Sequence, residues 1–361
     1  MKIKQLTIQN FRNLAWVDLK PESTFNVIYG INGSGKTSFL EAVSYLAMGR
    51  SFRSNKYQNL IRNGQQGFVV SGSIESDTPN HLDRIGIARS RGRDSNDLQI
   101  SINGKHVNRL IDLINHICVQ IIQPQGIDLI TGGPEQRRSF IDWGVYYSNQ
   151  DYQSIWFNYK KILQQRNMLL KMKASDEEIS VWDDLLCNLS EKITTLRENY
   201  LNCLNAILSE KVNQFLPQFC FTFSLSRGWE NRSELRSLLR SSLERDKLLG
   251  YTFYGCHRAD IKIRCDQNLA SETLSRGQLK LLVCAMRLSQ GTLLQLQHNK
   301  SCIYLIDDLS SELDAHSKHI LLSDLFRFKN QVFITNISKD LDVPDTDSCN
   351  FINIAESIQD F

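Results

Sequence analysis

Alternating apolar and polar positions dominate the N-terminal part of the chain. The alternation over residues 1–8 and over Leu14–Leu19 predicts two strands, separated by a break at residues 10–13. A short apolar run at Phe25–Tyr29 predicts a third strand, which leads into a glycine-rich turn. Further short strands are predicted at residues 69–74, 85–88 and 98–102. We therefore expect this part of the chain to be rich in β-structure.

Helical spacing of apolar residues replaces the alternation in the middle of the chain. It covers residues 152–170 and 179–215, and Ser175 with Glu178 supplies a capping box between the two segments. The second segment, counted from its cap, contains roughly 40 residues and should extend about 60 Å. Two long helices joined by a short polar break predict an antiparallel helical hairpin. We interpret its aromatic residues as core packing.

A helix from Ser38 to Gly49 and two buried strands complete the pattern. Continuous apolar runs at residues 302–306 and 331–335 are typical of parallel strands that are covered on both faces. A strand at 219–225 and a helix at 234–249 precede them. We expect residues 1–140 and 251–361 to form two halves of one α/β head, with a helical lobe at 141–250 inserted between them.

Composition and charge exclude several classes of protein. The chain has 361 residues with 41% hydrophobic and 22% charged residues, which is typical of a folded protein. It lacks a secretory signal pattern and a long apolar segment, so we expect a cytoplasmic location and no membrane partner. The net charge is only +3, so any nucleic-acid binding must be local. The basic stretch at residues 84–93 fits a phosphate contact or, slightly better, a solvated hairpin rim.

The nine cysteines contain no C-x-x-C pair. This pattern favours free thiols in a reducing compartment. Cys256, His257 and Cys265 lie close in sequence, but their spacing fits no zinc motif. We expect no metal site there.

A complete phosphate-binding loop follows the third predicted strand. Glycines in such a turn let backbone N–H groups converge on phosphate oxygens. Lys36 is expected to contact the β- and γ-phosphates, and Thr37 to offer its hydroxyl to Mg²⁺. The nucleotide-binding residues predicted here are Gly30, Asn32, Gly33, Ser34, Gly35, Lys36 and Thr37.

Two adjacent aspartates end the buried strand at 302–306. Asp307 is expected to help hold Mg²⁺, and Asp308 to act as the general base or to orient the attacking water. Alone, such a pair is usually a solvated strand end. Its combination with a complete phosphate loop favours a catalytic interpretation.

The segment Leu274-Ser275-Arg276-Gly277-Gln278 opens another predicted helix, with Ser275 as its N-cap. A helix N-terminus beside a glycine is a second anion-binding feature. Within one chain it has no evident ligand, because the phosphate loop already holds the nucleotide. A second anion-binding feature without a ligand in its own chain predicts that the chain dimerises.

These motifs together resemble the RecF family, the SMC-like recombination mediators of bacteria. The segment 274–278 is similar to the LS-x-G-Q/E motif of ABC-type ATPases. Residues 306–308 and 311–314 are similar to their Walker B motif and D-loop. The resemblance continues through residues 10–13, 49–53, 133–138 and 257–260, in family order and over nearly the whole chain.

The resemblance implies an α/β fold, a P-loop ABC-type ATPase head with a mixed β-sheet and an inserted helical hairpin lobe. It implies an ATP- and Mg²⁺-dependent homodimer that binds double- and single-stranded DNA. With a RecR-type partner it would help load RecA in gap repair, replication restart and the SOS response. The residues expected to act across the dimer are Ser275, Arg276, Gly277, Gln278 and Asp314.

Several positions depart from the ABC pattern or stay ambiguous. Asp308 stands where most ABC ATPases carry glutamate, so slow hydrolysis is expected. Thr335 and Asn336 stand where many have a switch histidine. The Q-loop glutamine is one of Gln120, Gln123 and Gln125, of which Gln125 matches best. Arg12 either contacts the nucleotide or anchors the turn.

Basic residues near the motifs are candidates for DNA contact, although each could instead pair with a surface carboxylate. They are Arg50, Arg53, Lys56, Arg62, Arg137 and Arg138. An alternative function is a nucleotide-gated scaffold that recruits repair proteins while its hydrolysis is incidental. A transporter or nuclease subunit is disfavoured, because the chain lacks a membrane segment, a coupling domain and a second metal cluster.

Overall fold

The computed structural model describes residues 1–21, 24–78, 81–92, 98–230, 233–308, 313–339 and 349–358. It divides into two compact units, Met1–Gly126 with Cys284–Phe361, and Ile127–Val283. The second unit contains the expected lobe at 141–250 and extends beyond it at both ends. Among the described helices, none combines the length and apolarity that a membrane span requires.

A parallel sheet of five strands forms one layer of the first unit, in the order β14-β3-β13-β12-β8. Each of its neighbouring pairs is parallel. The buried runs predicted at 302–306 and 331–335 are its strands β12 and β13, which confirms their interpretation. The strands are β3 (Phe25–Tyr29), β8 (Val119–Ile122), β12 (Ile303–Ile306), β13 (Val332–Asn336) and β14 (Cys349–Asn353).

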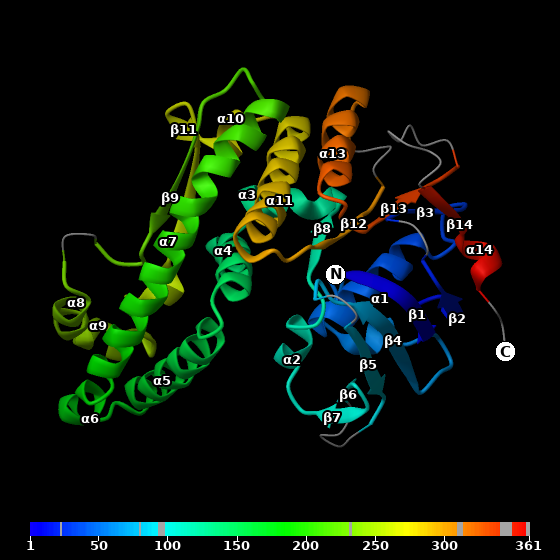
Figure 1. Cartoon of the computed structure of the whole chain (residues 1–361). Coiled ribbons are helices and arrows are strands. Elements are labelled where there is room, and N and C mark those ends of the chain that lie inside the picture. The colour runs from blue at the N-terminus through cyan, green and yellow to red at the C-terminus, as the bar shows by residue number, and fades with distance from the viewer. Residues whose placement is uncertain are drawn as a thin grey trace. The chain divides into compact units, whose positions relative to one another are not determined.

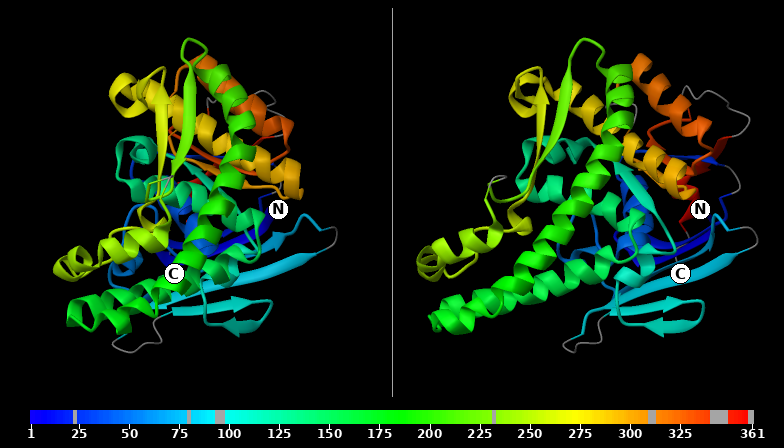
Figure 2. Two further views of the ribbon diagram at one scale, coloured as in Figure 1. Left: turned by 90° about the vertical axis from the view of Figure 1, so that its left-hand side faces the viewer. Right: turned by 60° about the vertical axis from the view of Figure 1, so that its left-hand side comes forward.

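A second sheet of the same unit is antiparallel, in the order β2-β1-β4-β5-β6-β7. Its long strands run side by side in both views of Figure 2. The strands are β1 (Lys2–Phe11), β2 (Leu14–Leu19), β4 (Gly67–Glu75), β5 (Leu82–Ser90), β6 (Leu98–Ile102) and β7 (Lys105–Val107). We expected one sheet with both parallel and antiparallel strands. The structure instead has one parallel sheet and one antiparallel sheet.

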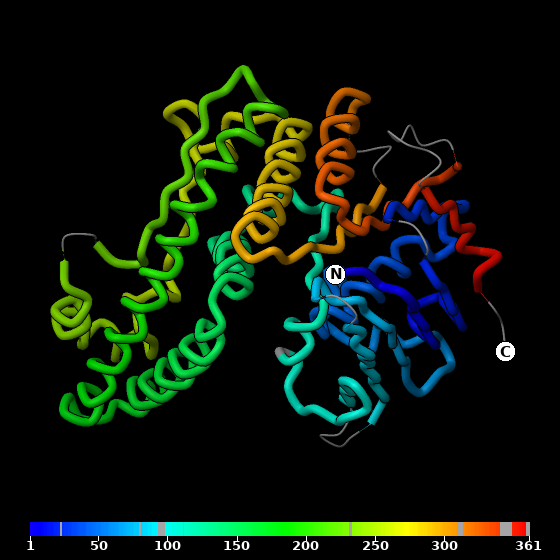
Figure 3. Tube along the Cα trace, viewed as in Figure 1, coloured from blue at the N-terminus to red at the C-terminus, as the bar shows by residue number. Residues whose placement is uncertain are grey.

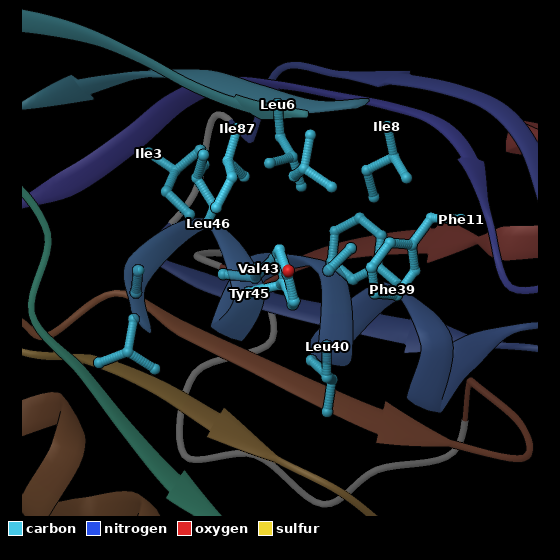
Figure 4. Packing of buried hydrophobic residues seen from close by; sticks show 14 of the residues in the cluster. Ile3, Leu6, Ile8, Phe11, Phe39, Leu40, Val43, Tyr45, Leu46 and Ile87 are labelled. Carbon is cyan, nitrogen blue, oxygen red and sulfur yellow. The ribbon is translucent and has the colours of Figure 1, made fainter. Parts of the chain in front are cut away.

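Helix α1 (Lys36–Met48) lies between these two sheets (Figures 1 and 4). Leu6 and Ile87 of the antiparallel sheet point toward it, and Phe39 of the helix packs against Phe333 of β13. All of these side chains are at most 1% exposed. Burial of each such side chain contributes about 1.5–3 kcal/mol. The helix that begins at the phosphate loop is therefore held on both faces by the hydrophobic core.

The second unit is built on α5 (Tyr152–Met172) and α7 (Asp183–Phe215), which lie side by side in Figure 3. The predicted hairpin is confirmed, as is the capping box of Ser175 and Glu178, which opens α6 (Asp176–Ser180). The expected continuous helix is interrupted at residues 181–182. The helix expected at 234–249 is likewise divided at Ser242 into α8 (Leu235–Ser241) and α9 (Leu243–Leu249).

Two buried arginines connect the helices of this unit. Arg166 of α5 pairs with Asp183 of α7 and Asp246 of α9, at 2.8 and 2.9 Å. Arg197 of α7 makes two hydrogen bonds to Asp142, at 2.7 and 3.0 Å. Both guanidiniums are fully buried. Because a buried charge is costly unless it is paired, these contacts fix how the helices pack.

The remaining elements are short or connect the larger ones. In the first unit they are η1 (Tyr57–Leu60), α2 (Ile111–Ile114), α13 (Ala315–Arg327) and α14 (Ile354–Ser357). In the second they are α3 (Asp128–Thr131), α4 (Pro134–Ser148), β9 (Phe221–Ser226), η3 (Cys256–Arg258), β10 (Asp260–Cys265), β11 (Asn268–Leu269) and α10 (Ala270–Thr273). The boundary between the units falls within η2 (Pro124–Ile127) and α11 (Arg276–His298).

Candidate nucleotide site

The predicted phosphate loop joins β3 to α1. Gly30, Gly33 and Gly35 all have positive φ, at 155°, 83° and 105°. A Cβ at Gly35 would lie 2.6 Å from Leu14, so both the backbone angle and the space require glycine there. Gly35 is the N-cap of α1 and no side chain caps the helix. The first N–H groups of α1 are therefore available to an anion.

The polar side chains of the loop fit a phosphate group. The Lys36 ammonium folds back over the loop and donates to the carbonyl oxygens of Gly30 and Ile31, at 2.6 and 3.0 Å. Partial burial lowers the pKa of Lys36, and the carboxylates of Asp308 and Asp307 oppose that shift. The buried hydroxyl oxygen of Ser34 has no hydrogen-bond partner among the described residues. A phosphate oxygen would satisfy it.

Asp307 lies beside the phosphate loop because β12 and β3 belong to the same parallel sheet. The Thr37 hydroxyl donates to Asp307 Oδ1 at 3.0 Å, as does the Thr335 hydroxyl at 2.8 Å. A hydroxyl and a carboxylate so close together provide the hard oxygen ligands that Mg²⁺ prefers. The donor set therefore fits the metal expected from the sequence.

The second aspartate is held in an unusual conformation. Asp308 has φ of 54°, and its N–H donates to the Thr335 hydroxyl oxygen at 2.8 Å. Thr335, at the position of a switch histidine, thus bridges both aspartates from the neighbouring strand β13. The Asn336 amide donates to the backbone oxygen of Ser338 at 2.9 Å. This role of Thr335 was not evident from the sequence.

The three candidate glutamines of the Q-loop have different surroundings. Gln120 is buried within β8 and its amide contacts Gln290 at 3.2 Å, so it does not face the aspartates. Gln123 and Gln125 follow the end of β8, which lies next to Asp307 because the Asp307 N–H donates to the Ile122 oxygen at 2.9 Å. The Gln123 side-chain oxygen is buried without a partner in the described part of the chain. Gln123 and Gln125 therefore both stay candidates for the Q-loop residue.

Arg12 anchors the turn in which it lies. Its guanidinium makes two hydrogen bonds to the buried carboxylate of Glu41, at 2.8 and 2.9 Å, and one to the Asn59 oxygen at 2.8 Å. The neighbouring Asn13 donates to the Gly33 oxygen at 3.0 Å and accepts from Ser38 at 2.8 Å. The turn between β1 and β2 thus supports the phosphate loop.

A shallow pocket of about 650 Å³ opens beside this turn. Such a volume is within the usual range for small-molecule sites. Arg12 therefore has a structural role and also faces a space where a nucleotide could extend. The pocket is lined by Arg12, Asn13, Ser38, Asn59, Ile61, Arg62 and Asn63.

The second anion-binding motif begins α11. The Ser275 N–H donates to the Gln278 side-chain oxygen at 2.9 Å, and the Gln278 N–H donates to the Ser275 hydroxyl oxygen at 3.3 Å. Ser275, Arg276 and Gly277 are exposed, and no atom lies within 4 Å of a Cβ built on Gly277. This helix end is open to an external group.

Asp314 has a capping role in the structure. Its carboxylate accepts from the Ser317 N–H at 2.8 Å and from the Ser317 hydroxyl at 3.1 Å, at the start of α13. These hydrogen bonds lower the pKa of Asp314, and the bond from the Ser317 N–H has the largest effect. Ser311 and Glu312, expected in the D-loop, lie outside the described residues.

The DNA-contact candidates fall into two groups. Arg50 and Lys56 are exposed, Arg62 lines the pocket, and Arg53 is exposed but lies 3.7 Å from the buried Glu41 carboxylate. In contrast, Arg137 makes two hydrogen bonds to Asp260, at 2.7 and 3.0 Å, and Arg138 donates to the Ala259 oxygen at 2.8 Å. Arg137 and Arg138 therefore hold β10 and its preceding loop, and their contact with DNA stays a prediction.

Two other sequence features have structural roles. Arg89 of the basic stretch donates to the Tyr45 hydroxyl at 3.1 Å, and Arg93 lies outside the described residues. Cys256 is fully buried, and its burial raises the pKa of its thiol to about 11. Cys265 is buried on β10.

A parallel sheet with a phosphate loop after one strand and paired aspartates after another defines a P-loop nucleotide-binding head. A solved SMC head domain bound to the C-terminal winged-helix domain of ScpA has the same fold, with a TM-score of 0.57 and 14% identity over 94% of this chain and 90% of that one. The family model for the RecF/RecN/SMC N-terminal domain matches residues 2–348. The chain belongs to the RecF family.

Its relatives match it over most of their length. The DNA replication and repair protein RecF of Shewanella sp. (strain MR-7) is 42% identical over 93% of this chain and 92% of its own. That of Salmonella arizonae is 39% identical, over 97% and 98%. A solved structure of the recombination mediator RecF with ATP, from the RecFOR pathway, has a TM-score of 0.86 and 26% identity, over 98% of this chain and 96% of that one.

Proposed function

We propose that this chain is an ATP-dependent DNA-binding recombination mediator of the RecF type. The observation that carries the proposal is the hydrogen bond of 3.0 Å from the Thr37 hydroxyl to Asp307 Oδ1. It brings the Walker B aspartate to a complete phosphate loop in a chain of this family. ATP bound there would receive hydrogen bonds from the loop N–H groups and from Lys36 and Ser34. Mg²⁺ would be held by Thr37 and Asp307, where it would neutralise charge on the phosphate oxygens.

Hydrolysis by this site is expected to be slow. Asp308 is the candidate for the residue that orients water, with Gln123 or Gln125 beside it, and its side chain is one methylene shorter than the glutamate usual in ABC ATPases. A shorter side chain places its carboxylate farther from the attacking water, and a small misplacement is costly in catalysis. The enzyme is therefore a weak, DNA-stimulated ATPase.

The exposed start of α11 is proposed to close the site from a second copy of the chain. Ser275 and Gly277 of one subunit would donate to the γ-phosphate held by Lys36 of the other, with Arg276, Gln278 and Asp314 nearby. The ATP-bound homodimer would then bind duplex and single-stranded DNA, including their junctions, in the bacterial cytoplasm. With a RecR-type partner it would help load RecA in gap repair, replication restart and the SOS response.

The shared site is tested by Ser275→Arg. The long cationic side chain should block the approach of α11 to a second subunit's nucleotide while leaving the subunit's own phosphate loop intact. We expect Ser275→Arg to bind ATP as a monomer and to sediment without the ATP-dependent dimer of the unaltered protein.

Ser271→Arg is the matched control, because Ser271 is also exposed and lies four positions earlier, in α10. It should dimerise normally. A normal ATP-dependent dimer of Ser275→Arg would rule out the shared site.

A further inference from the structure

The segment between α9 and β10 presents aromatic rings to solvent. Tyr251 and Phe253 are 36% and 37% exposed, and Tyr254 is half-buried. The residue between the first two, Thr252, is only 1% exposed. Exposed rings with a buried polar residue between them reverse the usual order of burial, so a packing role alone does not explain this segment.

The backbone of this segment is held from within the unit. The Thr252 hydroxyl accepts from Arg166 at 2.9 Å and donates to Asn167 at 2.8 Å. The N–H groups of Thr252 and Phe253 donate to Asn167 and Asp246, at 2.8 and 3.1 Å. The rings are therefore presented by a fixed backbone and lose little freedom when they bind a partner.

Two arginines lie over these rings. The Arg245 guanidinium carbon is 3.7 Å from the centroid of Phe253 and 5.1 Å from that of Tyr254. The Arg258 guanidinium carbon is 5.0 Å from the centroid of Tyr251. Both arginines are exposed. The rings orient the guanidiniums by cation–π attraction.

The positive charge of this cluster is not neutralised. Within the described part of the chain, neither Arg245 nor Arg258 has an ion-pair partner. The carboxylates closest in sequence have other ion-pair partners: Glu244 pairs with Lys247, Asp246 with Arg166, and Asp260 with Arg137. The pKa of the adjacent His257 is lowered to about 4, first by burial and further by Arg258 and Arg138, which is consistent with a positive local field.

We propose that this cluster, the stacking platform of Tyr251, Phe253, Tyr254, Arg245 and Arg258, binds the unpaired bases of single-stranded nucleic acid. Aromatic rings and guanidinium planes both stack on bases without regard to sequence, and unpaired arginines attract the phosphate backbone. A base in a duplex is already stacked and cannot use such a surface. The inference rests on the proposed function, which it deepens by separating unpaired from paired DNA.

The test measures binding of the full-length chain to a fluorescent oligodeoxythymidylate and to a duplex, with and without ATP. Loss of one stacked base contact weakens binding by about tenfold. We expect this loss for Phe253→Leu on the oligodeoxythymidylate, with duplex binding changed by less than about twofold. Arg245→Gln should reduce the salt dependence of single-strand binding.

The matched controls are Phe157→Leu and Arg240→Gln, which change an aromatic residue and an arginine that are also exposed in the second unit. Neither should alter binding to the oligodeoxythymidylate. Thermal unfolding of every variant checks that it is folded. In addition, 5-iodouracil in the oligonucleotide should crosslink to an aromatic residue of the platform.

Three outcomes would overturn the platform. In the first, the unaltered protein does not bind the oligodeoxythymidylate. In the second, Phe253→Leu binds it as tightly as the unaltered protein does. In the third, Phe253→Leu loses as much affinity for the duplex as for the oligodeoxythymidylate. Leu248 is 87% exposed nearby, so loss of RecR-type partner capture with unchanged single-strand binding would assign the surface to a protein instead. Absence of ATP-dependent duplex binding in the unaltered protein would count against the proposed function alone, because the platform is also tested without nucleotide.

Discussion

At the scale of single residues, His257 shows how burial sets a protonation state. Its Nδ1 lies 2.6 Å from the Tyr159 hydroxyl, and its Nε2 lies 3.0 Å from the Thr252 carbonyl oxygen. A carbonyl only accepts, so Nε2 carries the proton and Nδ1 accepts from the tyrosine. The neutral ring is thus fully bonded. A second proton on Nδ1 would oppose the tyrosine hydrogen bond.

This arrangement predicts a pH dependence of stability. Burial lowers the pKa of His257 to about 4, below the ordinary value of 6.5. Between these values the unfolded chain binds more protons than the folded one. The free energy of unfolding should therefore fall as the pH is lowered through this window, by at most about 1.4 kcal/mol per pH unit.

Comparison of unfolding midpoints at pH 7 and pH 5 measures this contribution. His257→Gln retains a polar side chain without the titration, so its midpoint should depend less on pH than that of the unaltered protein. His319→Gln changes an exposed histidine on α13 and serves as the control. Equal pH dependence in all three proteins would contradict the prediction.

The residues of the phosphate loop were predictable, whereas their supports were not. Gly30 to Thr37 form a local motif whose spacing alone encodes the geometry. Thr335 reaches the site from β13 and Asn13 from the turn between β1 and β2, and only the packing of these elements brings them there. The sequence pointed to Thr335 as a departure from a known pattern without indicating its bonds to both aspartates.

At the scale of elements, the pair of the buried Arg197 and the partly buried Asp142 joins α7 to α4. Arg197 also donates to the Cys256 oxygen at 2.7 Å. When one partner of a buried pair is removed, the remaining charge has no adequate compensation. We expect Asp142→Ala to reduce the free energy of unfolding by about 3–5 kcal/mol.

A surface pair one residue along α7 provides the control. Glu198 pairs with Arg227 at 2.7 Å, with their side chains 31% and 38% exposed. Glu198→Ala should cost under about 1 kcal/mol, because water screens such a pair. Thermal or denaturant unfolding of both variants separates the cases, and similar losses would show that burial does not set the strength of the Arg197 pair.

Elements with a long periodic pattern were the easiest to predict. The core of α5 and α7 follows the 3.6-residue period over many turns, so burial of one face was clear from the sequence. Strand β8 has only four residues and no alternation, and it was missed although it brings the candidate glutamines to the site. Its place depends on pairing with β12, a contact between distant parts of the chain.

At the scale of the whole molecule, hydrolysis and assembly are separate steps that one substitution should uncouple. Asp308→Asn preserves the size of the side chain and removes its charge. If Asp308 orients the attacking water, the variant should bind ATP and form DNA-bound dimers that persist longer than those of the unaltered protein. The lifetime of these complexes, measured after dilution with excess unlabelled DNA, tests this expectation.

The same variant distinguishes a mediator that must hydrolyse ATP from a scaffold whose hydrolysis is incidental. Full repair in cells that carry Asp308→Asn would favour the scaffold. Asp324→Asn is a control, because Asp324 is a buried aspartate of α13 outside the phosphate loop and the Walker B pair. It should leave the lifetime of the complexes unchanged.

The order of motifs predicted the architecture of the whole chain, because the phosphate loop and the aspartates must meet on one sheet although about 270 residues separate them. The boundaries of the two units were harder to predict from the sequence. The compact second unit is wider than the helical segment, since β10 and its neighbouring loop pack with α4 through Arg137 and Asp260. Periodicity within a helix carries no information on such contacts.

The turn between β1 and β2 constrains how the protein can be engineered. Asn10 and Arg12 both adopt left-handed backbone angles there, and Asn13 bonds directly to the phosphate loop. Loop tips usually accept inserted peptides, labels or altered lengths. This one should not, because even one added residue would shift Asn13 away from Gly33. An epitope or fluorophore intended to leave nucleotide affinity intact therefore belongs elsewhere on the chain.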